Sequence, residues 1–306
     1  MNELLALIGI VVLAGSGVLA AIVRGATTAG DRLFAALVLL GSSCGLVASG
    51  LALAGIDTGP LTRAWSVPGG MLAVHVDPLS AMFLAQICVI GALCAIYGLR
   101  YWAAPENPRT SVRLRAFYGL MMAGMALLVI ARNGILFLVG WEIMAIAAFF
   151  TITADDNEGP VREAGFVYLI ATRVGTLGVF ATFAVLRSIS GSFSLSLEGL
   201  DGAAPLATAA FLLGVAGFGL KAGLMPLHVW LPGAHANAPS HVSALMSGVL
   251  IKMGIYGLLR LCSFFEAIPV WWGLFLFALG VLSAILGVAF AIAQHDLKRL
   301  LAYHSV

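Results

Sequence analysis

The chain has 306 residues, of which 61% are hydrophobic and 10% are charged, and its mean hydropathy is +1.04. A soluble globular protein carries about 25% charged residues. The composition therefore excludes a soluble globular domain and predicts a polytopic membrane protein. We expect a lipid bilayer around the chain and no nucleic acid partner.

Nine segments are long and apolar enough to cross a membrane as helices, since a span needs about 20 mostly apolar residues. In chain order they are 4–23, 33–55, 78–99, 114–131, 134–153, 164–187, 205–224, 241–261 and 270–293. A tenth segment begins after Arg299 as LLAYHSV, and its seven residues are too few to cross a bilayer. The sequence thus predicts an all-α transmembrane helix bundle that is cut off at the start of a tenth span.

Lysine and arginine residues outside these spans or at their ends lie mostly on one side of the predicted membrane. Nine are on one side: Arg24, Arg32, Arg100, Arg109, Arg113, Arg115, Arg162, Lys298 and Arg299. Four are on the other: Arg63, Arg132, Arg187 and Arg260. Because cytoplasmic loops carry the excess of basic residues, the sequence predicts an N-terminus outside the cell membrane of a bacterium or archaeon.

The segment 225–240 interrupts the pattern of spans. It reads MPLHVWLPGAHANAPS and contains three prolines, Pro226, Pro232 and Pro239. Proline disrupts a helix, and irregular backbone at membrane depth is tolerated where it is buried in protein or lines a wet cavity. We expect the seventh span to break just after Lys221 and to continue as an irregular or short amphipathic piece. The alternative is an ordinary surface loop.

Besides the basic residues at span ends, four charged residues fall inside the predicted spans: Glu142, Arg173, Lys221 and Lys252. A charge at mid-bilayer costs roughly 2.5–3.5 kcal/mol on insertion scales, and such residues commonly mark an ion or proton path. A buried lysine beside a carboxylate can hold or release a proton when its partner moves. We therefore interpret Glu142, Lys221 and Lys252 as a proton relay. A structural role stays open for Glu142, and equally for Arg173, which can simply tie helices together.

Three histidines cluster near the expected break: His228, His235 and His241. Histidine titrates near neutral pH, so these residues are candidates for secondary relay sites. Lys298, near the end of the chain, is a further candidate. The alternative for His235 and His241 is that they only satisfy broken backbone.

The cysteines predict no metal centre. Cys44, Cys88, Cys94 and Cys262 all lie in apolar runs, and none forms a CxxC pair. An iron–sulfur or zinc site needs closely spaced ligands, so we expect no metal or cofactor in this chain and no catalytic residue of its own.

The motifs KAGLMPLHVWLPGAH, APSHVSALMSGV and HDLKRLLAYHSV resemble the antiporter-like membrane subunits of respiratory complex I and related complexes. Within that family the chain is most similar to the membrane subunits of hydrogenase-4 and formate hydrogenlyase. The resemblance is strong over 130–306 and weak before about residue 75. It implies an antiporter-like fold built from two inverted five-helix repeats.

The resemblance also implies a division of the chain. Residues 1–111 would be the first three helices, 112–261 the first repeat with its half-channel, and 262–306 the truncated start of the second repeat. The second half-channel would lie outside these residues.

For the site, the resemblance implies that Glu142 pairs with Lys221 and that Lys252 hands protons onward. The family motif around Arg173 often reads Arg, any residue, Gly, Asp, but here Thr176 replaces the acid. An ion pair that uses this acid is therefore in doubt.

For function, the resemblance implies a proton-translocating, non-catalytic subunit of a group 4 [NiFe] hydrogenase or a complex I-like respiratory complex. Its partners would be other membrane subunits and a peripheral redox arm, which would hold the [NiFe] and iron–sulfur centres. Two alternatives stay open: a Na+/H+ antiporter subunit, and a structural membrane anchor without an ion path.

Overall fold

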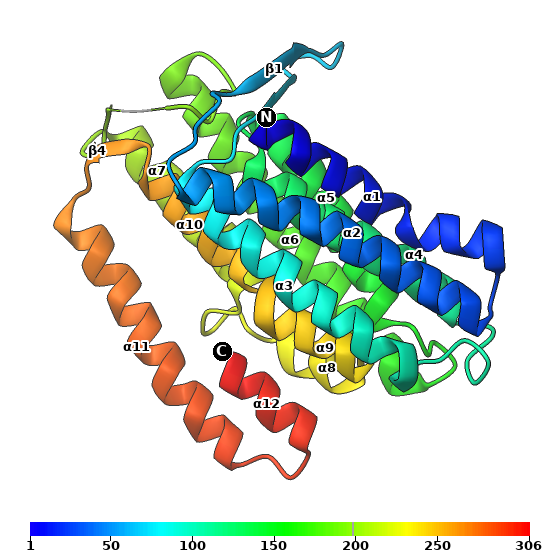
Figure 1. Cartoon of the computed structure of the whole chain (residues 1–306). Helices are drawn as coiled ribbons and strands as arrows, with labels where there is room; N and C mark the ends of the chain where they lie inside the picture. The colour runs from blue at the N-terminus through cyan, green and yellow to red at the C-terminus, as the bar shows by residue number, and fades with distance from the viewer. Residues whose placement is uncertain (198) are drawn as a thin grey trace.

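The computed structural model describes residues 1–197 and 199–306, and its long helices pack side by side as a bundle (Figure 1). Within these residues nine helical spans are long and apolar enough to cross a membrane, which confirms the nine predicted spans and the all-α class. Seven of them precede the break: α1 (Asn2–Arg24), α2 (Thr28–Leu53), α3 (Pro78–Tyr101), α4 (Ser111–Ile130), α5 (Gly134–Ile152), α6 (Gly159–Ser190) and α7 (Pro205–Ala222).

The predicted break in the seventh span is confirmed. Helix α7 ends at Ala222, and Gly223 follows with φ +75°, a left-handed conformation that glycine adopts without steric cost. The chain then turns through Pro226 into the short helix α8 (Trp230–Asn237). The eighth span is composite, because α9 (Ser240–Leu245) leads through the π-helix η1 (Met246–Leu250) into α10 (Lys252–Cys262).

The last two helices lie at the edge of the bundle. Helix α11 (Val270–Ile292) is largely exposed, with α12 (Leu297–Ser305) packed beside it, and α12 also contacts α8 (Figure 1). The assignment of 1–111, 112–261 and 262–306 to separate units of a repeat architecture stays a prediction.

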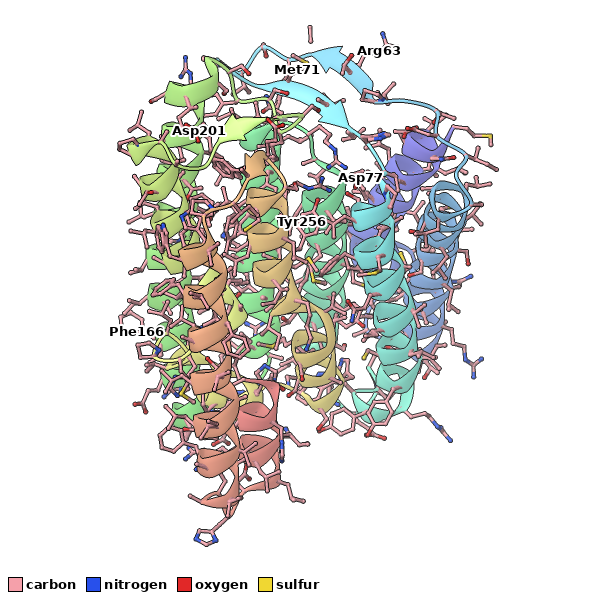
Figure 2. The ribbon with its side chains drawn as sticks, turned by 90° about the vertical axis from the view of Figure 1, so that its left-hand side faces the viewer. Arg63, Met71, Asp77, Phe166, Asp201 and Tyr256 are labelled. Atoms are coloured by element: carbon pink, nitrogen blue, oxygen red, sulfur yellow. The ribbon has the colours of Figure 1, made fainter. Side chains whose placement is uncertain are left out.

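Two small strand pairs, which the hydropathy pattern did not predict, cap one end of the bundle. Strands β1 (Leu61–Ala64) and β2 (Met71–Val74) form an antiparallel hairpin, and β3 (Leu200–Asp201) pairs in parallel with β4 (Phe265–Ala267). Figure 2 shows Arg63, Met71 and Asp201 together at this end. We call this end the hairpin end.

A charged network joins three parts of the bundle near the hairpin end. The carboxylate of Asp77 accepts hydrogen bonds from Arg260 of α10 at 2.7 and 2.9 Å and lies 2.8 Å from Arg132, which precedes α5. Asp77 also caps α3, since it accepts from the backbone N–H of Ser80 at 2.9 Å. Burial alone would raise the pKa of Asp77, but the hydrogen bond from Arg260 and the charge of Arg132 hold that pKa well below its usual value. One carboxylate thus serves two guanidinium groups.

The substitution Asp77→Asn tests this network. Asparagine keeps the helix cap but leaves Arg132 and Arg260 without a counter-charge, so we expect a loss of about 2–3 kcal/mol in unfolding free energy. Because the pKa of Asp77 is lowered in the fold, its contribution is complete above about pH 3.9 and fades as the pH falls below that value. Thermal unfolding in detergent measures the change. Glu266→Gln, which changes an exposed carboxylate on β4 at the same end, is the control and should leave the melting temperature unchanged. An unchanged melting temperature for Asp77→Asn would contradict the importance of the network.

Glycines bring α6 and α7 into close contact and so set the position of Lys221. A Cβ on Gly217 would lie 2.6 Å from the backbone nitrogen of Val179 and 2.8 Å from the carbonyl of Gly175. A Cβ on Gly178 would lie 2.9 Å from the Cα of Gly217. Small residues permit such backbone approach between membrane helices.

We expect Gly217→Ala to force α7 away from α6 and to cost about 1–3 kcal/mol, because the clashing atoms are backbone and cannot turn aside. The control is Gly50→Ala in α2, where a Cβ meets nothing within 4 Å. That control should be neutral or slightly stabilising, since alanine is the better helix former. Equal melting temperatures for the two variants would contradict the close-contact account.

Candidate functional site

Lys221 lies in the last turn of α7 with 2% of its surface exposed. Its ammonium donates a hydrogen bond to the Tyr168 hydroxyl at 2.9 Å. The rings of Trp141, Tyr168 and Trp230 surround the ammonium, with centroids at 5.9, 5.1 and 5.9 Å. A ring face attracts a cation within about 6 Å, by roughly 2 kcal/mol when water is excluded. We call these three rings the aromatic cage.

The break after α7 completes the aromatic cage. Trp230 is the first residue of α8, and the turn at Gly223 folds α8 back toward the end of α7. The indole N–H of Trp230 donates to the carbonyl of Leu220 at 2.8 Å. The last carbonyls of a helix have no partner within it, so this bond both satisfies the helix end and fixes the ring beside Lys221.

Glu142 of α5 binds a different cation from the one expected. Its carboxylate forms an ion pair with Arg173 of α6 and accepts from the Thr176 hydroxyl at 2.7 Å. Among residues 1–197 and 199–306, Lys221 forms no ion pair, so the expected direct pair between Glu142 and Lys221 is wrong for this conformation. The replacement of an acid by Thr176 gives a physical reason, because Arg173 has no acid one turn along its helix and pairs with Glu142 instead.

Glu142 and Lys221 are nevertheless linked through two side chains. Thr176 donates to Glu142 and accepts from the indole N–H of Trp141 at 3.1 Å. The ring of Trp141 is in turn a wall of the aromatic cage. A change in the position or charge of Glu142 can therefore reach Lys221 through Thr176 and Trp141.

The Glu142 cluster faces the outside of the bundle. The side chain of Arg173 is 51% exposed and that of Glu142 is 27% exposed. Glu142 and Thr176 line an open groove of about 580 Å³ between α4, α5 and α6, whose other walls are apolar. Those walls include Phe117, Leu120, Ile143 and Phe180.

Lys252 lies next to the π-helix. Its ammonium donates to the carbonyl of Ser247, within η1, at 2.5 Å. A π-turn displaces carbonyls from the regular ladder and is frequent at functional sites. Lys252 lines a polar cavity of about 610 Å³ together with His235, Lys298, His304 and several serines, and we call this space the Lys252 cavity.

The secondary candidates fall into three places. His235 and Lys298 line the Lys252 cavity, where His235 Nδ1 lies 3.2 Å from the Ser243 hydroxyl and Lys298 donates to the carbonyl of Ala238 at 3.0 Å. His228 instead packs between Phe290 and Tyr303, with centroids at 6.3 and 6.0 Å. His241 lines a separate cavity near α2, α3 and α4.

Sequence reasoning missed the aromatic cage, the hydroxyl of Tyr168, and His304 and Ser305 of α12, which line the Lys252 cavity beside the predicted Lys298. Trp141 adjoins Glu142, and Trp230 lies within the proline-rich break, so the sequence could have indicated both as residues near the site. The sequence could not have indicated Tyr168, because nothing in an apolar helix shows which group its hydroxyl contacts.

One group of metal-binding side chains lies among the residues that the structure describes, far from this site. It consists of Glu3, Asp57 and His75. The two ring nitrogens of His75 face different carboxylates, at 3.2 Å from Glu3 and 3.8 Å from Asp57. Each of the three residues offers one ligand atom, and these atoms lie within 4.8 Å of one another. The absence of cofactors from the chain stays a prediction.

Comparison with known proteins places this site in a family. Residues 131–306 match the family described as NADH:quinone oxidoreductase/Mrp antiporter, TM. The chain is 38% identical to hydrogenase-4 component B of Escherichia coli strain K12 over 239 residues, which is 77% of this chain and 35% of that protein. It is 34% identical to formate hydrogenlyase subunit 3 of the same organism over 251 residues, 80% of this chain and 40% of that protein. The chain thus spans little more than a third of these relatives.

A solved structure shows the same fold. A chain of the Mrp complex from Dietzia sp. DQ12-45-1b aligns with a TM-score of 0.83 and 27% identity, over 99% of this chain and 32% of that chain. The family match covers more than half of the 306 residues and includes α7, its break and the composite eighth span. The chain is an integral membrane protein that belongs to the NADH:quinone oxidoreductase/Mrp antiporter transmembrane family.

Proposed function

We propose that this chain is the proton-input part of a membrane subunit in a group 4 [NiFe] hydrogenase or a similar complex I-like complex. The observation that carries the proposal is the buried ammonium of Lys221, held by the aromatic cage and one hydroxyl, with no carboxylate bound to it among the described residues. A cation held this way has no fixed counter-charge, so its proton can be released when its surroundings change. The similarity to hydrogenase-4 component B and formate hydrogenlyase subunit 3 supports the kind of complex.

Glu142 would control the charge of Lys221. While Arg173 neutralises Glu142, that carboxylate stabilises the Lys221 ammonium less than an unpaired carboxylate would. When Arg173 moves away, the uncompensated carboxylate stabilises a protonated Lys221 through Thr176 and Trp141, and re-pairing withdraws this stabilisation. Lys221 would thus take up a proton when the Glu142–Arg173 pair opens and release it when the pair closes.

Lys252 would receive the proton. Its cavity brings together two ammonium groups, two imidazoles and several hydroxyls, which are groups that can pass protons over short distances. His235 Nε2 is buried and has no partner among the described residues, so it is free to accept a proton there. Lys298 and His304 would continue the path, whereas His228, which packs on aromatic rings, is a structural residue in this account.

The surroundings of Lys221 favour a proton over Na+ as the transported ion. Hard cations are bound by several oxygen ligands, whereas the aromatic cage offers three rings and one hydroxyl around a group that is itself cationic. The Na+/H+ antiporter alternative is therefore the weaker one, although an Mrp subunit shares the fold. Proton transport that does not depend on the sodium concentration would exclude this alternative.

The remaining proposals concern the setting of the chain. We infer a bacterial or archaeal cell membrane with the N-terminus and the hairpin end outside. Other membrane subunits would contact the exposed Glu142 groove. The [NiFe] and iron–sulfur centres would lie in a peripheral redox arm formed by partner subunits.

Lys221→Met in the intact complex tests the proposal. Methionine keeps the length and the contact with the rings but cannot carry a proton, so we expect proton translocation to fall by about tenfold or more. Redox turnover should remain, and assembly should be intact. Proton uptake by inverted membrane vesicles, measured beside hydrogen evolution, separates the two activities. Arg299→Gln, a nearby exposed charge, is the control, and unchanged pumping by Lys221→Met would reject the proposal.

Arg173→Gln tests the control step. Without its cation, Glu142 should hold the proton on Lys221 permanently, so pumping should fall several-fold while redox turnover continues. Thr176→Val, which keeps the ion pair but removes the hydroxyl link, should give a smaller loss. If Arg173 only ties α5 to α6, the melting temperature will fall while the ratio of protons to electrons stays at the wild-type value.

A further inference from the structure

A small, partly open cavity lies between α2, α3, α4 and the first turn of α9, at the end of the bundle away from the strands. Its polar lining residues are Asp31, Trp102, Ser111, Arg115, Tyr118 and His241. Asp31 and Arg115 form a buried ion pair at 3.2 Å, and Arg115 also donates to the carbonyl of Gly25 at 2.8 Å. These bonds fix the turn between α1 and α2 against α4. We call this space the His241 cavity.

Three buried polar atoms belong to residues that line the His241 cavity and lack a hydrogen-bond partner in the described part of the chain. They are Ser111 Oγ, Arg115 Nη1 and His241 Nδ1. The three residues are 1%, 5% and 5% exposed. Arg115 Nη1 has the charge of Asp31 nearby but no hydrogen bond to it. A buried polar atom without a partner costs about 1–3 kcal/mol, so three in one cavity indicate a shared ligand.

The size and chemistry of the His241 cavity fit water. The space open to the centre of a water molecule is about 20 Å³. One water needs roughly 10–15 Å³ on this measure and two to four polar partners. A water bound here would accept from Arg115 Nη1 and donate to Ser111 Oγ and His241 Nδ1, the three atoms that lack a partner among the described residues. Phosphate or any organic ligand is too large.

His241 connects this cavity with the Lys252 cavity. A Cβ on Gly98 of α3 would lie 3.2 Å from His241 Cδ2 and 3.3 Å from Nε2, so this edge of the ring packs on α3 one turn before Tyr101. The Tyr101 ring meets that of His241 edge-on at 5.8 Å between centroids, and its hydroxyl accepts from Ser240 at 2.9 Å. Ser240 is a lining residue of the Lys252 cavity. His241 thus contacts the ring of Tyr101, whose hydroxyl is bonded to a lining residue of the Lys252 cavity.

We propose that the His241 cavity binds one water molecule and that this water and His241 form a proton-uptake port that supplies the Lys252 cavity. The water gives a proton to His241 Nδ1 and is left as hydroxide. The imidazolium gives its Nε2 proton to the Tyr101 oxygen, and Tyr101 passes its own hydroxyl proton to Ser240 once the Ser240 hydroxyl has turned its proton toward the Lys252 cavity. Rotation or tautomerisation of the ring then restores His241, and the water is reprotonated from the cytoplasmic side. This inference rests on the proposed proton transport by the same chain.

The pair Tyr101→Phe and Tyr97→Phe tests the path in the intact complex. Both tyrosines lie on α3 one turn apart, with rings 5.3 Å from each other, but the Tyr101 hydroxyl is the one bonded to Ser240. Tyr101→Phe keeps the ring and should slow proton uptake by several-fold at unchanged redox turnover. Tyr97→Phe should have no effect. Equal rates for the two variants and wild type would overturn the path.

Ser111→Val and His241→Phe test the port. Valine fills the cavity with methyl groups and phenylalanine removes the proton carrier, so both should slow uptake as Tyr101→Phe does. Ser49→Ala controls for loss of a buried hydroxyl, since Ser49 bonds only the carbonyl of Gly45 in its own helix. A cryo-EM map of the intact complex that resolves water should show one density peak within hydrogen-bond distance of Ser111, Arg115 and His241.

The outcomes separate this inference from the proposed function. If Lys221→Met stops pumping while Ser111→Val, His241→Phe and Tyr101→Phe pump normally, the port is wrong and the relay stands. If Lys221→Met pumps normally, both fail. A resolved map without density in the cavity overturns the water site even where variants of His241 misfold.

Discussion

The structure depends on excluding water from the ammonium group of Lys221. Lys221 would lose several kcal/mol of hydration on burial, and no carboxylate in the described chain binds it in return. The aromatic cage and the Tyr168 hydroxyl offset that loss with ring quadrupoles and one hydrogen bond. Other features serve this arrangement. Gly217 lets α7 approach α6, where Tyr168 lies, and the break at Gly223 returns Trp230 to the end of α7.

The separation of Glu142 from Lys221 gives the site two states. An ammonium locked to a carboxylate would be hard to deprotonate, whereas an ammonium among rings responds to distant charge. Arg173 holds the carboxylate at the surface of the bundle, in a groove that other membrane subunits would cover. A movement of Arg173 in that interface would change how strongly Glu142 stabilises the protonated form of Lys221. The site is thus arranged so that a surface event can control a buried proton.

The sequence predicted the elements well because apolar length decides them. All nine spans were found, and the prolines around α8 indicated the break next to Lys221. The ion-pair partner of each charged residue was harder to predict, because it depends on the depth and rotation of each helix. Glu142 was assigned to Lys221 but pairs with Arg173, although Thr176 already signalled that the usual acid was missing. Arg132 and Arg260 were counted as loop charges, yet they share Asp77 within the bundle. The π-helix before Lys252 leaves no trace in hydropathy.

The most direct test of the account is the ratio of protons moved to electrons transferred in the intact complex that carries Tyr168→Phe. Phenylalanine keeps the ring of the aromatic cage and removes only the hydroxyl that receives the Lys221 hydrogen bond. If Lys221 holds and releases the proton through this contact, the ratio will fall toward that of a complex without Lys221, while electron transfer continues. A ratio equal to that of the wild-type complex would contradict the account, because the hydroxyl would then have no part in proton movement.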